Sequence, residues 1–349
     1  MRELLSRQPF DCAVFHHGIY VPMGLIGEVA RHEGVRVVNW IQAYRKNCFI
    51  FSHDDTYHHT LMTEPVDRWE EMPWNAAIER QLLDYLKSRW QGTGDWIRFH
   101  DRPDFDLEAI AAEVGVDFAK PCVGLLTNVI WDAQLHYPAN AFGNMLEWIL
   151  ETIRYFAQRP DLQLLVRVHP AEITGFIPSR QKVVDEIRRA FASLPPNVFV
   201  IPPESRVSTY AAMSRCDCVI IYGTKTGVEL TSVGIPVIVA GEAWIRNKGI
   251  TLDAASREAY FDMLAQLPLG RRLDAATTER ARKYAYHFFF RRMIPLAFFE
   301  PKKNSPHFKI AINDLKELLP EKFKGLDVIC DGILRGTDFI YPAEFHIES

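Results

Sequence analysis

A Gly-Thr-Lys-Thr-Gly run, from Gly223 to Gly227, directly follows an apolar stretch of this 349-residue chain. Glycines let a backbone approach a ligand closely, and free N–H groups at the start of a helix favour a phosphate. The hydroxyls of Thr224 and Thr226 would add two more donors. The run therefore predicts a phosphate-binding turn in which both glycines and both threonines take part.

Glu229 lies three residues beyond Thr226, where two roles compete. With Thr226 as the N-cap, the pair would form a capping box, which is a structural role. A carboxylate one turn into such a helix could instead accept hydrogen bonds from ribose hydroxyls, as in dinucleotide-binding folds. The sequence leaves both roles open.

The stretch LLVRVHPAEI, residues 164–173, ends an apolar run on His169, Pro170 and Glu172. Proline ends the strand and fixes the exit of the chain. An imidazole beside it can donate a hydrogen bond to a phosphate or protonate a leaving group. Taken alone, His169 is more simply explained as a histidine satisfied by a backbone carbonyl. The phosphate-binding turn expected nearby favours the chemical role.

These residues need elements that bring them together. Five apolar runs alternate with helical patterns between residues 120 and 255: CVGLLTNV, LQLLVRVHP, NVFVIPP, DCVIIYG and IPVIVAG. The alternation predicts an α/β fold with a doubly wound parallel sheet whose strands are buried on both faces. Ligands bind beyond the carboxyl ends of such strands. Thr127, Asn128 and Asp132 follow the first run, so we expect them at the same edge as His169.

The first 118 residues show one strand–helix–strand unit, DCAVFHHGIYVPMGLIGEVARHEGVRVVNW. Only two strands are evident before an irregular stretch rich in histidine and aromatic residues, which predicts a short or incomplete N-terminal domain. His16 and His17 follow the first strand and are candidate general bases, with loop packing around Gly18 as an equal alternative. We expect domains at 1–118 and 119–270, with helices and a tail at 271–349 packing back on them.

Composition narrows the class of protein. The net charge of −4 and the pI of about 6.3 give no bulk attraction to nucleic acid or to anionic membranes. The chain has six cysteines but no C-x-x-C pair, no signal peptide and no apolar run of the ~20 residues that a membrane helix needs. A cytoplasmic protein is therefore expected.

Two further segments have alternative interpretations. Asp54 and Asp55 lie near His53, His58 and His59 and could bind a metal, but their spacing matches no recognised site, so an exposed polar loop is favoured.

The second segment is residues 284–303, YAYHFFFRRMIPLAFFEPKK. It could press onto a bilayer as a peripheral membrane contact. It could equally be a buried helix that spans the two domains, which is favoured because Pro295 interrupts any long amphipathic helix.

The span from about 122 to 255 resembles the capsule polysaccharide biosynthesis proteins, glycosyltransferases of the GT-B architecture that include Kdo-transferase-like members. The resemblance is carried, in this order, by LLTNVIWDA, LVRVHPAE, CDCVIIYGTKTGVELTSVGIPVIVAG and NKGITLDA. Residues 1–118 resemble only the later part of an N-terminal GT-B domain. The resemblance implies two Rossmann-like domains facing a cleft, with the donor on the C-terminal one.

The resemblance also implies an activity, which is transfer of a sugar from a CMP-, UDP- or GDP-linked donor to a cell-surface or lipid-linked glycan, without a cofactor or a bound metal. In the branch that uses CMP-Kdo, the histidine of the His-Pro motif contacts the donor phosphate. That branch also carries a catalytic Asp after the first strand of the C-terminal domain, a nucleophile for a retaining transfer. The residues predicted for catalysis are Asp132, His169, His16 and His17, and those predicted to bind the donor are Thr127, Asn128, His169, Glu172, Gly223, Thr224, Thr226, Gly227 and Glu229.

Three other functions compete with this one. A nucleotide-sugar epimerase of the same architecture would turn over the donor without an acceptor. A polyol-phosphate transferase is disfavoured, since that class carries a Ser-rich turn and an Asp where this chain has Thr224, Thr226 and Glu229. A non-catalytic partner in polysaccharide assembly is the last alternative.

Overall fold

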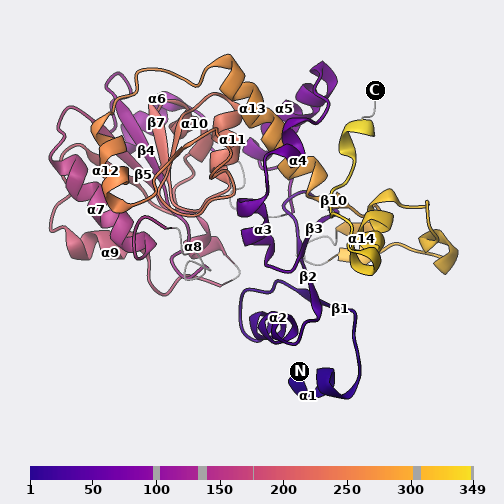
Figure 1. Ribbon diagram of the computed structural model, residues 1–349. Coiled ribbons are helices and arrows are strands. Elements are labelled where there is room, and N and C mark those ends of the chain that lie inside the picture. Colours follow the sequence, from indigo (N-terminus) through magenta and orange to yellow (C-terminus); the bar gives the residue numbers. More distant parts are fainter. Residues whose placement is uncertain (97–102, 133–139, 176, 302–307, 347–349) are drawn as a thin grey trace. The chain divides into compact units, whose positions relative to one another are not determined.

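The computed structural model describes residues 1–96, 103–132, 140–175, 177–301 and 308–346. The chain divides into two compact units, which we describe separately (Figure 1). The first unit takes residues 1–85, 93–97 and 283–349, and the second takes residues 86–92 and 98–282. These limits differ from the domain ranges predicted above, since the segment from Lys283 onward belongs to the first unit.

The second unit is built on a six-stranded sheet in which all neighbouring strands run parallel. The strands are β4 (Cys122–Leu126), β5 (Gln163–Arg167), β6 (Val198–Ile201), β7 (Cys218–Ile221), β8 (Val237–Val239) and β9 (Leu252–Asp253). Their order is β6-β5-β4-β7-β8-β9, which is the 3-2-1-4-5-6 order of the Rossmann fold. The predicted α/β class and parallel sheet are confirmed. The sixth strand was not predicted, because two residues show no periodicity.

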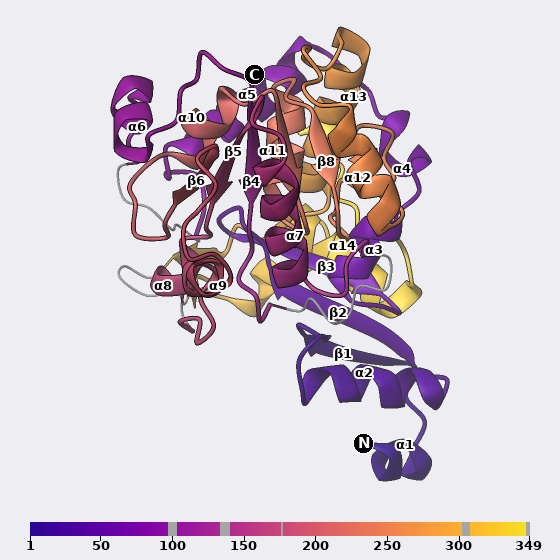
Figure 2. The same cartoon turned by 90° about the vertical axis from the view of Figure 1, so that its left-hand side faces the viewer.

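Helices cover both faces of this sheet (Figures 1 and 2). On one side lie α7 (Met145–Ala157), α9 (Val183–Ala190) and α12 (Arg257–Ala265), and on the other lie α10 (Thr209–Ser214) and α11 (Thr226–Ser232). The unit also holds α6 (Leu107–Val114), α8 (Ala171–Thr174) and most of α13 (Ala275–Tyr286). Gly124 shows why β4 fits between two layers, because a Cβ there would lie 2.3 Å from Met213 Sδ of α10.

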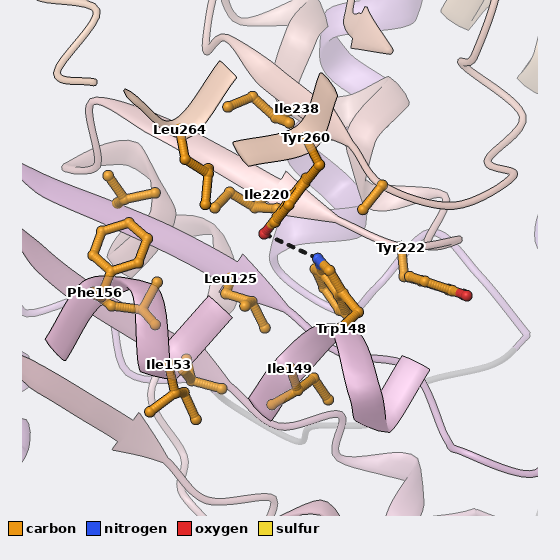
Figure 3. Packing of buried hydrophobic residues seen from close by; sticks show 14 of the residues in the cluster. Leu125, Trp148, Ile149, Ile153, Phe156, Ile220, Tyr222, Ile238, Tyr260 and Leu264 are labelled. Atoms are coloured by element: carbon orange, nitrogen blue, oxygen red, sulfur yellow. Dashed lines mark hydrogen bonds between the residues drawn. The ribbon is translucent and has the colours of Figure 1, made fainter. Parts of the chain in front are cut away.

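The core between the sheet and α7 is apolar, with one buried polar cluster (Figure 3). Trp148 Nε1 donates to the hydroxyl of Tyr260 at 3.1 Å, and that hydroxyl lies 2.7 Å from Thr152 Oγ1. All three residues are fully buried. Mutual hydrogen bonds remove the cost of burying these groups, so α7 and α12 are fixed against each other.

The first unit contains a four-stranded mixed sheet with the order β1-β2-β3-β10. The predicted strand–helix–strand unit is β1 (Cys12–His16), α2 (Met23–His32) and β2 (Arg36–Gln42), with β1 parallel to β2. The expectation of only two strands here is wrong. The apolar run CFIFSH forms β3 (Cys48–His53), antiparallel to β2, and β10 (Ile294–Pro295) pairs antiparallel with β3.

The C-terminal segment completes this unit. Ile294, Phe298 and Phe339 share a buried cluster with Val38 of β2 and Phe49 of β3. The tail, in which the sequence showed few periodic cues, contains the helix α14 (Lys324–Arg335). The other elements are α1 (Arg2–Arg7), α3 (Tyr57–Thr63), α4 (Asp67–Glu70), most of α5 (Ala76–Trp90), β11 (Phe299–Pro301), β12 (Phe308–Ile310), η3 (Leu315–Leu318) and η4 (Ala343–Phe345).

The aromatic segment from residue 284 is buried. A π-helix, η2 (His287–Arg291), directly follows α13, and His287, Phe288, Phe289 and Phe290 are all buried. The aromatic part of the segment is therefore buried as predicted, although the helix ends at Arg291 and the chain continues into β10 and β11. Lys302 and Lys303 lie outside the described residues. No helix in the described ranges is long and apolar enough to cross a membrane.

Candidate functional site

The sheet of the second unit reverses its strand order between β4 and β7. In open parallel sheets, ligands bind in the crevice outside the carboxyl ends at such a reversal. Leu126 at the end of β4 pairs with Ile221 of β7 on one side and with Arg167 of β5 on the other. The loops that begin at Thr127, His169 and Gly223 therefore leave one edge side by side. The structure brings these three predicted clusters together.

Thr127 and His169 are joined directly. Thr127 is buried, and its Oγ1 accepts a hydrogen bond from the backbone N–H of His169 at 3.0 Å. The Nδ1 of His169 accepts from the N–H of Ala171 at 3.1 Å. A ring nitrogen that accepts carries no hydrogen, so the neutral imidazole holds its hydrogen on Nε2. His169 is therefore an Nε2–H donor at the edge of the sheet.

Glu172 has a structural position. It is fully buried, and both carboxylate oxygens accept from the N–H of Val183, at 3.1 and 3.3 Å, where α9 begins. Burial raises the pKa of Glu172, against the opposing effects of the Val183 hydrogen bond and of Lys182. This placement gives no support to the predicted contact with a donor, because the carboxylate caps a helix.

The glycine-rich turn differs from the prediction in one respect. The N-cap of α11 is Lys225, so Thr226 is the first helical residue and the capping box, one of the two roles left open for Glu229, does not form. The N–H of Thr226 donates to Thr224 Oγ1 at 3.3 Å, and the two hydroxyl oxygens lie 3.2 Å apart. A Cβ at Gly227 would lie 2.6 Å from Ile221 Cδ1, so this glycine serves close packing of helix on strand.

Glu229 is fully buried and is held by three side chains. Its Oε1 lies 3.1 Å from Arg89 Nη2 and 3.0 Å from Lys225 Nζ, and its Oε2 accepts from the Tyr210 hydroxyl at 2.6 Å. Burial alone would raise the pKa of Glu229, but Arg89, Lys225 and Tyr210 outweigh it and lower the pKa to about 2. Glu229 therefore anchors an internal charge cluster, and its placement gives no support to the ribose contact.

The same cluster perturbs Lys225. Burial and the neighbouring Arg89 lower the pKa of Lys225 to about 8, because Glu229 offsets them only in part. Sequence reasoning did not assign a role to Lys225, Arg89 or Tyr210. The central position of Lys225 in the glycine-rich turn is a usable signal, whereas nothing in the sequence connects Arg89 to a carboxylate 140 residues away.

Arg167 is a further residue that the sequence analysis did not single out. It is buried at the end of β5, where its guanidinium donates to the carbonyl oxygens of Pro202 and Ser205. Burial lowers its pKa to about 10. Arg167 thus fixes the loop that follows β6 beside the candidate edge.

Asn128 and Asp132 follow β4. The backbone N–H of Asn128 points to Met145 Sδ at 3.3 Å, and its Oδ1 is buried without a hydrogen-bond donor from the described part of the chain. An orphaned amide oxygen at a ligand edge is a position that a ligand hydroxyl can satisfy. Asp132 is half-buried in a turn in which its N–H donates to Val129 O at 3.2 Å.

His16 and His17 lie in the first unit, whereas the other predicted site residues lie in the second. His16 ends β1, and burial lowers its pKa. His17 adopts a left-handed φ of 70°, its N–H donates to Trp40 O at 2.7 Å, and its ring packs 4.9 Å from that of Tyr20. This packing favours the loop role for His17 and leaves His16 as the more exposed of the two.

The acidic loop of the first unit was considered as a metal site. Asp55 Oδ2 lies 3.3 Å from His59 Nδ1, and His53 Nε2 lies 2.8 Å from Thr337 O. Across the described residues, no group of three or more His, Cys, Asp or Glu side chains could hold a metal ion. His53 and Asp55 instead help to line a cavity of about 300 Å³ that also includes Glu64 and Arg292. None of the predicted catalytic or donor-binding residues lines this cavity.

No family model and no curated protein matches the sequence. Among solved structures, the KpsC beta Kdo 2,4 transferase of Thermosulfurimonas dismutans aligns with a TM-score of 0.51 and 14% identity, covering 79% of this chain and 78% of that one. The chain has the fold of this transferase. The predicted GT-B-like architecture is therefore confirmed.

Two other solved structures are less similar. The KpsC beta Kdo 2,7 transferase of the same organism has a TM-score of 0.44 and 13% identity, covering 88% of this chain and 84% of that one. A UDP-GlcNAc 2-epimerase from Neisseria meningitidis, bound to UDP-GlcNAc, has a TM-score of 0.37 and 14% identity, covering 81% and 73%. At such identities the likeness concerns the fold alone.

Proposed function

We propose that this chain is a glycosyltransferase that transfers a sugar from a nucleotide-sugar donor to a glycan acceptor of the capsule or lipopolysaccharide type. One observation carries the proposal. His169, Thr127–Asn128 and the turn that begins at Gly223 leave one edge of the sheet, at the reversal of a 3-2-1-4-5-6 strand order. That reversal is where this topology binds nucleotides. The fold shared with a Kdo transferase agrees with it.

The proposed chemistry uses few groups. The bond between the anomeric carbon of the sugar and the donor phosphate breaks, and the phosphate leaves with the bonding electrons. The Nε2–H of His169 donates to that phosphate and stabilises its charge in the transition state. In a retaining transfer, Asp132 would bond to the anomeric carbon first, and an acceptor hydroxyl would then displace it and pass its proton to the departed donor phosphate. In an inverting transfer, the acceptor hydroxyl attacks directly and a general base takes its proton, a role for which His16 remains the candidate.

The donor site is tested by thermal shift of the purified chain against CMP, UDP, GDP, ADP and CDP. A ligand that binds only the native state raises the midpoint of unfolding. We expect one nucleotide class to give a shift that His169→Ala loses and that the control His32→Ala, at an exposed histidine of α2, retains. No shift with any nucleotide would overturn the proposal in favour of a non-catalytic assembly partner.

The threonines of the glycine-rich turn give a second test. Thr224→Ala and Thr226→Ala should each weaken nucleotide binding by about 1–3 kcal/mol, the range for losing a hydrogen bond to a charged group. Unchanged affinity in both variants would mean that the turn only begins a helix. Incubation of the matching nucleotide-sugar with and without acceptor glycan then separates transfer from epimerisation, since an epimerase converts the donor without an acceptor.

A further inference from the structure

Trp131 is exposed at the candidate edge. The chain has eight tryptophans, all within the described residues, and the other seven are buried or half-buried, whereas Trp131 is 44% exposed. It lies in the loop that leaves β4, between Ile130, which packs on the core of the second unit, and Asp132. Exposing an indole forgoes a large gain from burial, so a single exposed tryptophan at a ligand edge calls for an explanation.

The ring is held in place. Its only polar atom, Nε1, donates to Ser179 Oγ at 3.2 Å, and Ser179 is itself only 4% exposed. The N–H of Ser179 donates to Glu172 O at 2.9 Å, and the N–H of Glu172 donates to His169 O at 3.1 Å. A chain of hydrogen bonds thus links the indole to the histidine that we assign to the donor phosphate.

These contacts define the surface that Trp131 offers. Because Ser179 occupies Nε1, the exposed remainder of the indole is a flat apolar ring with no free hydrogen-bonding group. A sugar ring carries hydroxyls that need polar partners. A nucleobase, in contrast, has a planar π-face, and every one of the bases can stack on an aromatic ring through it. The surface therefore matches the base of a nucleotide better than it matches a sugar.

We propose that Trp131 is the stacking platform for the nucleobase of the donor, an inference that rests on the proposed donor site. Ser179 is then a positioning residue, because it fixes the plane of the indole without contacting the base. The role needs no particular base, and so it fits CMP, UMP or GMP equally.

The test compares a ligand with a base to one without it. Dissociation constants for CMP, UMP, GMP and ribose 5-phosphate are measured by calorimetry on the full chain and on Trp131→Ala. We expect Trp131→Ala to raise the dissociation constant of the preferred nucleotide by about 5- to 150-fold, the effect of losing one stacked base. The dissociation constant of ribose 5-phosphate should stay the same. His169→Ala should weaken both ligands. The matched control is Ile177→Ala, which shortens an exposed apolar side chain two residues before Ser179. This variant should change neither dissociation constant.

Two variants keep the test decisive where Trp131→Ala loses structure. Trp131→Phe retains a stacking face without Nε1–H, so it should bind the nucleotide within about fivefold of the parent chain but lose the quenching of tryptophan fluorescence that nucleotide causes. Ser179→Ala keeps the indole of Trp131 but removes the hydrogen bond that fixes its plane. This variant should bind the nucleotide more weakly than the parent chain does.

The outcomes separate the two proposals. If the parent chain binds nucleotide and Trp131→Ala binds it equally well, the stacking role is overturned and the donor site stands. A loss confined to the intact nucleotide-sugar, with the mononucleotide unaffected, also overturns it in favour of a sugar contact. If the parent chain binds no nucleotide, the donor site fails and the stacking role fails with it.

Discussion

Glu229 illustrates how a carboxylate is retained inside a protein. Two cations and a tyrosine hydroxyl surround it, and replacing it by glutamine keeps the shape but removes the negative charge. Breaking one side of a buried ion pair leaves the other charge uncompensated. We expect Glu229→Gln to lower the free energy of unfolding by about 3–5 kcal/mol, measured by urea denaturation. Glu258→Gln, at an exposed position of α12, should stay within ~0.5 kcal/mol of the parent chain.

The same residue predicts a pH dependence. The pKa of Glu229 is about 2 in the folded chain and has an ordinary value of 4.5. A group whose pKa is lower in the folded state than in the unfolded state stabilises the folded chain. This stabilisation is complete when the pH is above the pKa of the unfolded state, and it is lost as the pH falls toward the pKa of the folded state. The difference in unfolding free energy between the parent chain and Glu229→Gln should therefore narrow as the pH falls from 4.5 to 2. A difference that stays constant across this window would show that folding does not lower the pKa of Glu229.

At the residue scale, the sequence predicted which residues lie at the ligand edge of the sheet better than it predicted what each residue does there. Thr127, His169 and the glycine-rich turn were placed together because residues that end parallel strands must meet. Glu172 and Glu229 also follow strand ends, yet they turn inward. Their roles depend on Val183, Arg89 and Tyr210, whose positions are fixed only by the tertiary fold.

At the scale of elements, the close approach of the two segments that directly follow β7 and β8 depends on Gly241. A Cβ at this position would lie 2.6 Å from the backbone oxygen of Tyr222 and 2.9 Å from Asn140 Oδ1. Backbone cannot give way as a side chain can, so we expect Gly241→Ala to cost about 1–3 kcal/mol of stability in thermal or urea unfolding. Gly223→Ala is the control, since its Cβ would lie 3.4 Å from Glu242 O, an ordinary contact. Equal stability of the two variants would contradict the packing argument.

The pattern of apolar runs predicted β4 to β8 because each reads as a continuous run. Every residue of β4, β5, β7 and β8 is buried, whereas the edge strand β6 is buried at its two ends and half-buried between them. The pattern did not identify β3, although the burial of β3 is just as continuous, because its apolar residues lie among polar and histidine residues. The helix α14 was missed for a different reason. Besides Ile329, its buried positions are the glycines Gly325 and Gly332, which weaken a helical pattern, and Gly332 approaches Phe339 so closely that a Cβ would lie 2.1 Å from the ring.

At the scale of the molecule, each unit has its own apolar core. Phe339 is 1% exposed in the first unit, where its ring lies 5.3 Å from that of Phe51. Phe339→Ala should lower the free energy of unfolding of the first unit by about 3–5 kcal/mol and leave the stability of the second unit unchanged. Hydrogen exchange followed by mass spectrometry should then show faster exchange in β2 and β3 and unchanged protection in β4 and β5. Acceleration throughout the chain would mean that the two units unfold as one.

The division of the first unit between distant parts of the chain has a consequence for its biogenesis. A ribosome delivers residues 1–85 long before the segment from Lys283 onward, which supplies β10, α14 and Phe339. The intervening stretch takes roughly 10–40 s to translate at typical rates of synthesis. During that time the second unit emerges as a contiguous stretch from Arg98 to Arg282, whereas Val38 and Phe49 still lack their partners. The nascent N-terminal segment therefore has an interval in which a molecular chaperone would be needed to shield it.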